Sequence, residues 1–261
     1  MKQMVAPSAD SPLQALAVAL DQGTGENRPI VDLPMRKVFR AQGPAGPVIV
    51  KLWRLSDLKG RLRNLAGRTK GRAEWAVLTH LHGNGIPVPE PIALLDLRGM
   101  GLAHHEALVT EDISPCSEAS KVMRTLVAEG RSQEVRALGL EIVDITGRMV
   151  AAGIQDTDHC IRNFLVREDG RVFRIDFEKA LMLRPGFVRD RALARMLGML
   201  LGDHAIRCRK MPEETRIFAA ALKTAVGPSE ALARAVRRRA QDSLWRHRAR
   251  TGITVPADLG W

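Results

Sequence analysis

The sequence predicts an α+β protein in two parts, a small β-rich part with one main helix and a larger helical part that contains one β-hairpin. Three observations predict this order. Strand-forming residues dominate Ile30–Trp53, apolar residues recur at helical spacing after Pro115, and an Asp169-Gly170 turn separates two short apolar runs within the helical region. The length of 261 residues fits one domain with two lobes.

Residues 1–27 are expected to form an N-terminal arm. They are polar and interrupted by Gly and Pro around one apolar patch, Leu13–Leu20, which favours either a short helix or a loose segment. The chain starts with Met1–Val5 and reaches Pro7 without an apolar run, so we expect no secretory signal peptide.

The small part is expected to span residues 28–113 and to begin with a hairpin. A strand around Val38-Phe39 leads into the turn Gly43–Gly46, and the β-rich run Val48–Trp53 follows with Lys51 near its end. The remaining elements are a helix over Arg72–His82, a Pro-rich extended connector over Ile86–Pro91, and short strands over Ile92–Leu97 and Ala107–Thr110.

The large part is expected to span residues 114–261. Its clearest helix is Glu134–Ala152, in which apolar residues recur at every third or fourth position. A hairpin follows, with strands at Phe164–Val166 and Val172–Ile175. The chain from Arg189 onward is helix-rich, and Ser229 is expected to cap the start of a last, basic helix.

The charge is strongly basic, with 40 Lys and Arg against 29 Asp and Glu, a formal balance of +11. The surplus lies mainly in Lys51–Ala73, which holds eight basic residues and one acid, and in Ala231–Arg250, which holds seven Arg and one acid. Such segments suit nucleic acid, an anionic membrane face or a phosphorylated substrate, and they can also be plain solvated helix faces. With six Phe, four Trp and no Tyr, stacking platforms are scarce, so we expect no nucleic-acid partner.

The three cysteines, Cys116, Cys160 and Cys208, are odd in number and widely spaced, which favours a reducing cytosol over a disulfide framework. Cys160 is expected to pack in the interior rather than to act as a nucleophile. No stretch approaches the roughly 20 apolar residues of a membrane span. We therefore expect a cytoplasmic protein, with peripheral contact at the cytoplasmic face of the inner membrane as an option for its basic segments.

One group of residues is suited to catalysis. Phosphoryl transfer needs a carboxylate that takes the proton of the acceptor hydroxyl, an amide oxygen and a second carboxylate that hold Mg²⁺, and a Lys that steadies the phosphates. Asp158 lies five residues before Asn163, so one tight loop can direct both side chains into one cleft. Asn163 begins the predicted hairpin and Asp176 follows its end, so strand pairing is expected to bring these two side chains together.

These residues resemble the protein-kinase-like superfamily, whose catalytic loop has the spacing Asp-x₄-Asn and is followed by an Asp-Phe pair. Within it, the chain is most similar to the bacterial lipopolysaccharide kinases that phosphorylate Kdo or heptose of the inner core. The segments that carry this resemblance are Arg36–Arg40 with Val50-Lys51, Arg72–Leu81 with Gly85–Pro91, and Asn163–Leu165 with Ile175–Glu178. It extends over roughly residues 33–200 and implies a protein-kinase-like bilobal fold.

The resemblance implies a role for each matched residue. Asp158 would be the catalytic base, and Asn163 and Asp176 the metal ligands. Lys51 would contact the α- and β-phosphates of ATP, with Glu74 as its ion-pair partner. The segment Thr110–Ile113, which includes Glu111 and Ile113, would be the hinge whose backbone meets adenine. Asp190 would be the acid that braces the catalytic loop.

Several features separate the chain from protein kinases. Asp156 stands where their catalytic loop has His, and Glu178 stands where they have Gly. No Gly-x-Gly-x-x-Gly is present, so phosphate contacts are expected from Arg36, Lys37 and backbone amides. About a dozen residues separate Glu178 from Asp190, too few for a peptide-docking activation segment.

The first functional hypothesis is therefore an ATP- and Mg²⁺-dependent kinase that phosphorylates a sugar hydroxyl of the lipid A–core, with its basic segments binding an anionic glycolipid acceptor. The alternatives are a Ser/Thr protein kinase or an antibiotic-type phosphotransferase of the same fold, a pseudokinase that binds nucleotide or a polyanion, and a nucleic-acid binder. The oligomeric state stays open.

Overall fold

The computed structural model describes residues 11–24, 28–54, 69–97, 105–183 and 190–255, together with Leu259 and Trp261. The first ten residues of the expected arm and most of the first basic segment, residues 55–68, lie outside these ranges. The chain forms two compact units, which we describe separately. Unit 1 extends to His82 and includes Pro89–Ile113, and unit 2 comprises Gly83–Val88 and Ser114–Trp261.

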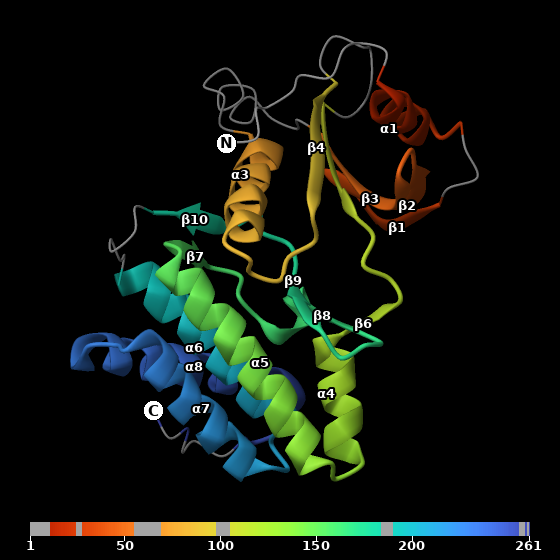
Figure 1. Ribbon diagram of the computed structural model, residues 1–261. Coiled ribbons are helices and arrows are strands. Elements are labelled where there is room, and N and C mark those ends of the chain that lie inside the picture. Colours follow the sequence, from red (N-terminus) through yellow and green to blue (C-terminus); the bar gives the residue numbers. More distant parts are fainter. Residues whose placement is uncertain are drawn as a thin grey trace. The chain divides into compact units, whose positions relative to one another are not determined.

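Unit 1 is built on a five-stranded antiparallel sheet with the order β1-β2-β3-β5-β4 (Figure 1). Its strands are β1 (Pro29–Leu33), β2 (Arg36–Gly43), β3 (Gly46–Trp53), β4 (Pro91–Asp96) and β5 (Glu106–Glu111). The predicted hairpin is β2–β3, in which Gly43 pairs with Gly46. A second tight hairpin precedes it, because Leu33 of β1 pairs with Arg36 of β2.

Two helices cover opposite faces of this sheet (Figure 1). Helix α1 (Pro12–Gln22) packs through Ala17 and Leu20 against the core face that includes Val50. Side chains alternate along a strand, so Lys51 points to the other face, where α3 (Lys70–Gly83) lies. The apolar patch of the expected arm is thus a helix that belongs to the core of unit 1.

The connector after α3 belongs to unit 2. The Arg148 guanidinium donates a 2.6 Å hydrogen bond to the Gly85 carbonyl, and the Arg174 backbone N–H donates a 2.9 Å hydrogen bond to the Pro87 carbonyl. Proline has no backbone N–H to donate, so bonds from the rest of unit 2 to the carbonyls of this segment hold the extended Gly83–Val88 in place.

Unit 2 is mainly helical, with five helices in its described residues: α4 (Ala119–Ala128), α5 (Ser132–Ala151), α6 (Asp190–Arg207), α7 (Pro212–Val226) and α8 (Glu230–Thr251). Helix α5 begins two residues before the predicted start and buries the predicted apolar stripe. Ser229 caps α8 as expected, since its side chain accepts the Leu232 N–H. The predicted α+β class, with a β-rich first part and a mainly helical second part, is confirmed.

Short strands hold the segment between α5 and α6. Strand β7 (Ile154–Asp156) pairs with β10 (Ala180–Met182), so the two ends of the segment lie side by side. Between them, β8 (Phe164–Arg167) and β9 (Val172–Arg174) form the predicted hairpin around Gly170, and β6 (Cys116–Glu118) pairs with β8. The 3₁₀ turn η1 (Ile161–Asn163) leads into β8.

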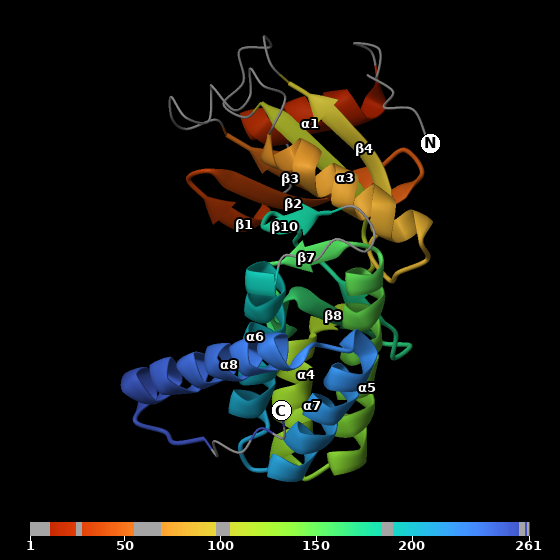
Figure 2. The ribbon, with the colours of Figure 1, turned by 90° about the vertical axis from the view of Figure 1, so that its left-hand side faces the viewer.

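Helix α8 lies close against α6 (Figure 2). Two glycines of α6 face α8 and permit this approach. A Cβ at Gly198 would lie 2.8 Å from the Val236 carbonyl oxygen and would overlap the Cβ of Arg239, and one at Gly202 would lie 2.8 Å from the Ser243 Cβ. The spacing of four residues puts both glycines on one face of α6. The close approach of the helices therefore depends on the absence of these side chains.

Gly198→Ala is expected to lower the free energy of unfolding by about 1–3 kcal/mol, because the added methyl group meets α8 backbone that must move. Urea unfolding followed by circular dichroism measures this change. Gly83→Ala is the matched control, since no atom lies within 4 Å of a Cβ at that position and Ala favours the helix. Equal stabilities of the two variants would contradict this account of the α6–α8 packing.

Candidate active site

In unit 1, Lys51 and Glu74 form a buried ion pair. The Lys51 Nζ lies 3.0 Å from Glu74 Oε1 and 3.1 Å from Oε2, and the Glu74 side chain is only 3% exposed. The two residues are 23 positions apart, and strand alternation together with the position of α3 brings them together. Sequence order suggested this pair, and the geometry in unit 1 agrees with it.

A second carboxylate holds the start of α3. Glu106, in β5, accepts a 2.5 Å hydrogen bond from the Thr69 hydroxyl, and Arg72 lies 3.8 Å away. Burial raises the pKa of the Glu106 carboxyl, and the hydrogen bonds from Thr69 and from the Gly71 backbone counter that shift. Glu106 therefore positions the helix that carries Glu74. The sequence analysis missed it, because a Glu in a predicted strand carries no local signal.

The two hinge residues differ in what their backbone can offer. The Glu111 N–H donates to the Glu90 carbonyl at 3.0 Å, so it is not available to a ligand. The backbone of Ile113 takes part in none of the hydrogen bonds within the described residues, and its side chain is buried. Asp112 is held by Arg40 at 2.6 Å. Arg36 lies at the start of β2, directly after the tight turn from β1.

In unit 2, Asp158 lies between two cations. Its Oδ2 accepts a 2.9 Å bond from Lys179 Nζ, and its Oδ1 lies 3.6 Å from Arg162. The Asp158 side chain is 23% exposed, so it can meet a substrate. Lys179 follows the Asp176 segment and was not predicted, because its proximity to Asp158 arises only where β10 pairs with β7.

Asn163 and Asp176 are placed by the β8–β9 hairpin. The Asn163 side-chain amide donates a 2.8 Å bond to the Asp158 carbonyl, which leaves its Oδ1 as the ligand atom. The Ile175 N–H donates to the Asn163 carbonyl at 2.9 Å. Asp176 has a φ of 63°, the left-handed region that non-glycine residues seldom adopt. Such strain persists only where the surroundings enforce it.

The side chain of Arg174 supplies much of that enforcement. It is fully buried and donates to the carbonyls of Asn163 (3.2 Å) and Asp176 (3.3 Å), and it forms an ion pair with Asp156. Asp156 in turn accepts a 2.9 Å bond from the Asp158 N–H. Burial raises the pKa of the Asp156 carboxyl, and the charge of Arg174 counters that shift. One guanidinium thus joins the backbone of both predicted metal ligands to the loop of the predicted base.

His159 completes this network as a neutral imidazole. Its Nδ1 accepts a 3.2 Å bond from Arg174 Nε, so the proton lies on Nε2, which donates to the Thr146 hydroxyl at 2.9 Å. The Thr146 hydroxyl donates onward to the Ile142 carbonyl. Burial and the charge of Arg174 hold the pKa of His159 well below its usual range. The buried Asp156–Arg174 ion pair thus lies in a loop in which Asp156 stands at the position of the His of protein kinases.

The acid that braces the catalytic loop is Asp203, and the prediction of Asp190 for this role was wrong. Asp203 Oδ2 accepts a 2.9 Å bond from the Ile161 N–H, and Arg207 holds its other oxygen at 3.0 Å. Asp190 begins the same helix, 13 residues or about 20 Å along the axis before Asp203. Its side chain is exposed and, among the described residues, makes no hydrogen bond or ion pair with the loop.

Cys160 is buried and free, and burial raises the pKa of its thiol. A thiol in this state is a poor nucleophile, in agreement with the expected packing role. The other cysteines are also free. Among the helices of the described residues, none is both long enough and apolar enough to cross a membrane.

Residues 51–213 match the sequence profile of the lipopolysaccharide kinase (Kdo/WaaP) family. The chain belongs to this family. The match begins at Lys51 and includes Glu74, the catalytic loop, the β8–β9 hairpin and α6. As a member, the chain is an ATP-dependent phosphotransferase of lipopolysaccharide biosynthesis with a hydroxyl group as acceptor.

Two curated relatives are named 3-deoxy-D-manno-octulosonic acid kinase. The protein of Xanthomonas campestris pv. campestris (strain B100) is 28% identical over 194 residues, which cover 70% of this chain and 73% of that protein. The protein of Stenotrophomonas maltophilia (strain K279a) is 32% identical over 155 residues, covering 58% of this chain and 53% of that protein.

Solved structures share the fold. WaaP in complex with acyl carrier protein matches with a TM-score of 0.63 at 19% identity, over 85% of this chain and 90% of that one. The ROP18 kinase domain in complex with AMP-PNP and sucrose matches with a TM-score of 0.54 at 15% identity, over 82% of this chain and 81% of that one. At these identities the matches show the bilobal kinase-like fold.

Proposed function

We propose that this protein transfers the γ-phosphoryl group of ATP to a hydroxyl of a Kdo sugar in the lipopolysaccharide inner core. The observation that supports the proposal is that one loop and one hairpin of unit 2 join Asp158, Asn163 and Asp176. The names of the curated relatives support Kdo, rather than heptose, as the acceptor sugar.

Each residue has a defined part in this proposal. Lys51, held by Glu74, steadies the α- and β-phosphates of ATP. Asp158 accepts the proton of the acceptor hydroxyl, and Lys179 and Arg162 hold its carboxylate in position. The free N–H of Ile113 is suited to bind adenine, whereas that of Glu111 is already engaged.

The donor set in unit 2 fits Mg²⁺. Asn163 offers an amide oxygen whose NH₂ group is already engaged, and Asp176 offers a carboxylate, and both are the oxygen ligands that Mg²⁺ prefers. When bound, Mg²⁺ would neutralise charge on the ATP phosphates. The Arg174 guanidinium donates to the Asp176 backbone carbonyl and so holds the backbone from which this carboxylate projects.

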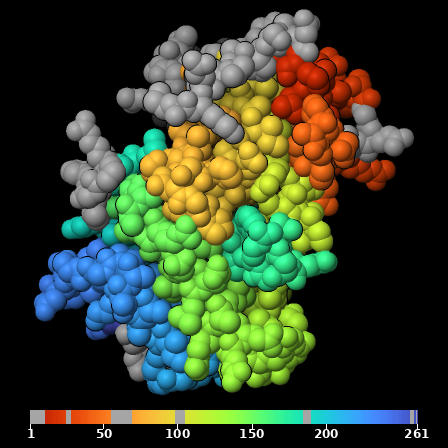
Figure 3. Space-filling view, in the orientation of Figure 1, coloured from red at the N-terminus to blue at the C-terminus, as the bar shows by residue number. Residues whose placement is uncertain are grey.

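Contact with the cytoplasmic membrane face is part of the proposal. Helix α8 lies at the surface of unit 2, in the blue region of Figure 3. Trp245 is 70% exposed on this helix, and the neighbouring Arg248 is exposed as well. An exposed Trp beside cationic side chains suits the interface of an anionic bilayer, where a basic residue contributes about 1 kcal/mol.

Phosphate transfer from ³²P-labelled ATP to a panel of acceptors tests the function. The panel contains Kdo-bearing lipid A, heptose-bearing core, aminoglycosides and generic protein substrates. We expect label on the Kdo acceptor. Transfer to another acceptor alone would contradict the assignment of Kdo, and ATP binding without transfer to any acceptor would favour the pseudokinase.

Asp176→Ala is expected to abolish the Mg²⁺-dependent component of ATP binding, because it removes a carboxylate ligand of the proposed metal site. Calorimetric titration of ATP with and without Mg²⁺ measures this component. Asp169→Ala, on the turn of the same hairpin, is the matched control and should leave ATP binding unchanged. Wild-type Mg·ATP affinity in Asp176→Ala would place the metal elsewhere.

A further inference from the structure

A basic pocket of about 580 Å³ lies in unit 2 beside the catalytic loop. Six Arg line it: Arg162, Arg195, Arg207, Arg239, Arg246 and Arg250. The pocket also includes His247, and Asp203 is its one carboxylate. Its volume lies within the usual range for small-ligand sites, about 300–1,000 Å³.

Helical spacing explains how the pocket is lined. On α8, Arg239, Ser243, Arg246 and Arg250 recur at steps of three or four and form one stripe. On α6, a facing stripe runs from Arg195 through Asp203 to Arg207 in the same way. Gly198 and Gly202 let the two helices approach, so the guanidinium groups of both stripes converge.

The pocket keeps an excess of positive charge. Asp203 is already engaged by the Ile161 N–H and by Arg207. Arg162 lies 3.6 Å from Asp158, and Arg239 lies 3.9 Å from Asp242. Within the part of the chain that the structure describes, Arg195, Arg246 and Arg250 have no carboxylate partner. Arg246 donates its Nε to the Asp242 backbone carbonyl at 3.1 Å, so the charge of these three guanidinium groups is not neutralised by a carboxylate and can meet an anion.

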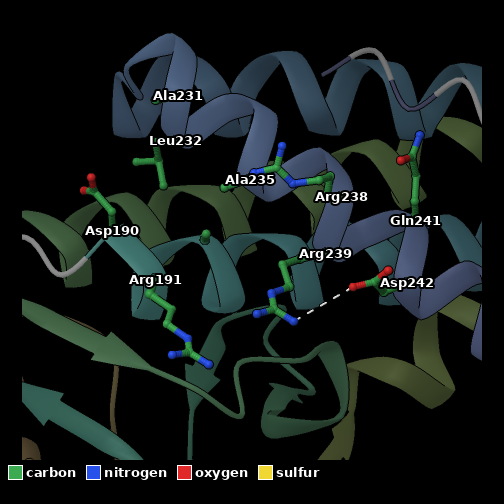
Figure 4. A pocket seen from close by; sticks show the side chains of 10 residues that line it. Asp190, Arg191, Ala231, Leu232, Ala235, Arg238, Arg239, Gln241 and Asp242 are labelled. Carbon is green, nitrogen blue, oxygen red and sulfur yellow. Dashed lines mark ion pairs between the residues drawn. The ribbon is translucent and has the colours of Figure 1, made fainter.

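A neighbouring pocket between the same helices is different. It is lined by two carboxylates, Asp190 and Asp242, and by Arg191, Arg238 and Arg239 (Figure 4). The Arg239 side chain points to Asp242, so part of the charge is neutralised there. No residue of the catalytic loop lines it. The charge balance and the position both favour the pocket beside the loop as a site for an anion.

The basic pocket is directly connected to the predicted base. Cys160 and Arg162, which follow Asp158 in the loop, form its wall, and the Arg162 guanidinium contacts the Asp158 carboxylate. Arg162 thus lies between Asp158 and an anionic molecule held by Arg195, Arg246 and Arg250. Planar guanidinium groups bind carboxylate and phosphate oxygens in pairs, which also orients the ligand.

We propose that this pocket binds the anionic groups, carboxylate or phosphate, of the sugar acceptor and so orients its hydroxyl toward Asp158. The inference rests on the proposed function and specifies its acceptor subsite. The name of the relatives' substrate, an octulosonic acid, fits this chemistry, because such a sugar carries a carboxylate at neutral pH.

The test compares two triple variants with equal loss of charge. Arg195→Gln/Arg246→Gln/Arg250→Gln removes the available cations of the pocket. Arg209→Gln/Arg234→Gln/Arg237→Gln removes three exposed Arg of unit 2 that line neither pocket. All six side chains are exposed, so both variants should fold. Calorimetry without ATP measures binding of a deacylated, Kdo-bearing core saccharide, which excludes lipid and membrane effects.

We expect the pocket variant to bind the saccharide on the order of 10- to 100-fold more weakly than the wild type, and the control variant to bind within about twofold. The difference should persist at ~0.15 M salt, where long-range attraction between exposed charges is screened. In kinase assays the pocket variant should raise the KM for the acceptor and leave the KM for ATP unchanged. Equal losses in both variants, or no loss in either, would overturn the proposal.

Two modified saccharides identify the anion. Reduction of the Kdo carboxylates, or enzymatic removal of the phosphates, should weaken binding to the wild type and have little further effect on the pocket variant. If each modification of the saccharide weakened binding to the pocket variant as much as binding to the wild type, the proposal would be overturned. A wild type that binds the saccharide in this way but never phosphorylates it contradicts the proposed function alone. Phosphoryl transfer by the pocket variant with the KM of the wild type for the acceptor contradicts the inference alone.

Discussion

Asp158→Asn should lower the rate of phosphoryl transfer by about 10²–10⁴-fold, the usual contribution of a positioned general base. The amide keeps the shape of the side chain but cannot accept the hydroxyl proton. ATP binding should stay nearly intact, because the predicted phosphate and metal contacts come from Lys51, Asn163 and Asp176. Single-turnover transfer to the Kdo acceptor, with ATP affinity measured in parallel, separates the two effects.

Asp144→Asn is the control for this variant. It is the same substitution on an exposed position of α5, where the carboxylate contacts only Arg148, at 3.6 Å, among the ion pairs of the described residues. We expect Asp144→Asn to catalyse phosphoryl transfer at the wild-type rate. A wild-type rate in Asp158→Asn would show that Asp158 is not the base. The contacts of Lys179 and Arg162 with Asp158 would then not serve to orient a catalytic carboxylate.

Arg174→Met should destabilise the protein by about 3–5 kcal/mol, since it leaves the Asp156 carboxylate buried without its counter-charge. It also removes the donors to the Asn163 and Asp176 carbonyls, so the affinity for Mg·ATP should fall as well. Urea unfolding and calorimetry measure the two quantities. Arg171→Met, an exposed Arg on the same hairpin, should change stability by less than ~0.5 kcal/mol.

A double variant separates stability from positioning. In Asp156→Leu/Arg174→Met both charges are gone, and apolar replacements of buried ion pairs are often close to neutral in stability. We expect most of the lost stability to return while the Mg·ATP affinity stays low. Recovery of both would show that Arg174 acts on stability alone, and a stable single variant with full affinity would contradict both roles.

The local pattern of the sequence was sufficient to predict most elements. The β-rich run Val48–Trp53, the helical stripe of Glu134–Ala152 and the Asp169-Gly170 turn are short-range signals, and the elements that they predict are confirmed. Strand β1 and the role of α1 were not predicted in this detail. They depend on packing against β2 and β3, which no local pattern encodes.

The candidate site divides in the same way. The spacing of Asp158, Asn163 and Asp176 was readable because one loop and one hairpin join them in the chain. Glu106, Lys179 and Arg174 were missed, and Asp190 was chosen in place of Asp203. In each case the residue contacts a segment that is distant in the sequence or that lies across a strand pair.

The sequence by itself determined the chemical types that this protein can use and the order in which they appear, because residue identity and short-range periodicity need no fold. Only the tertiary structure decided which charges are neutralised. Arg174 is held by Asp156, and Asp203 is engaged by the Ile161 N–H and Arg207, whereas Arg195, Arg246 and Arg250 face a pocket. The physical reason is that the effect of a charge depends on its distance from other charges and on its burial, and both arise only when distant segments pack together.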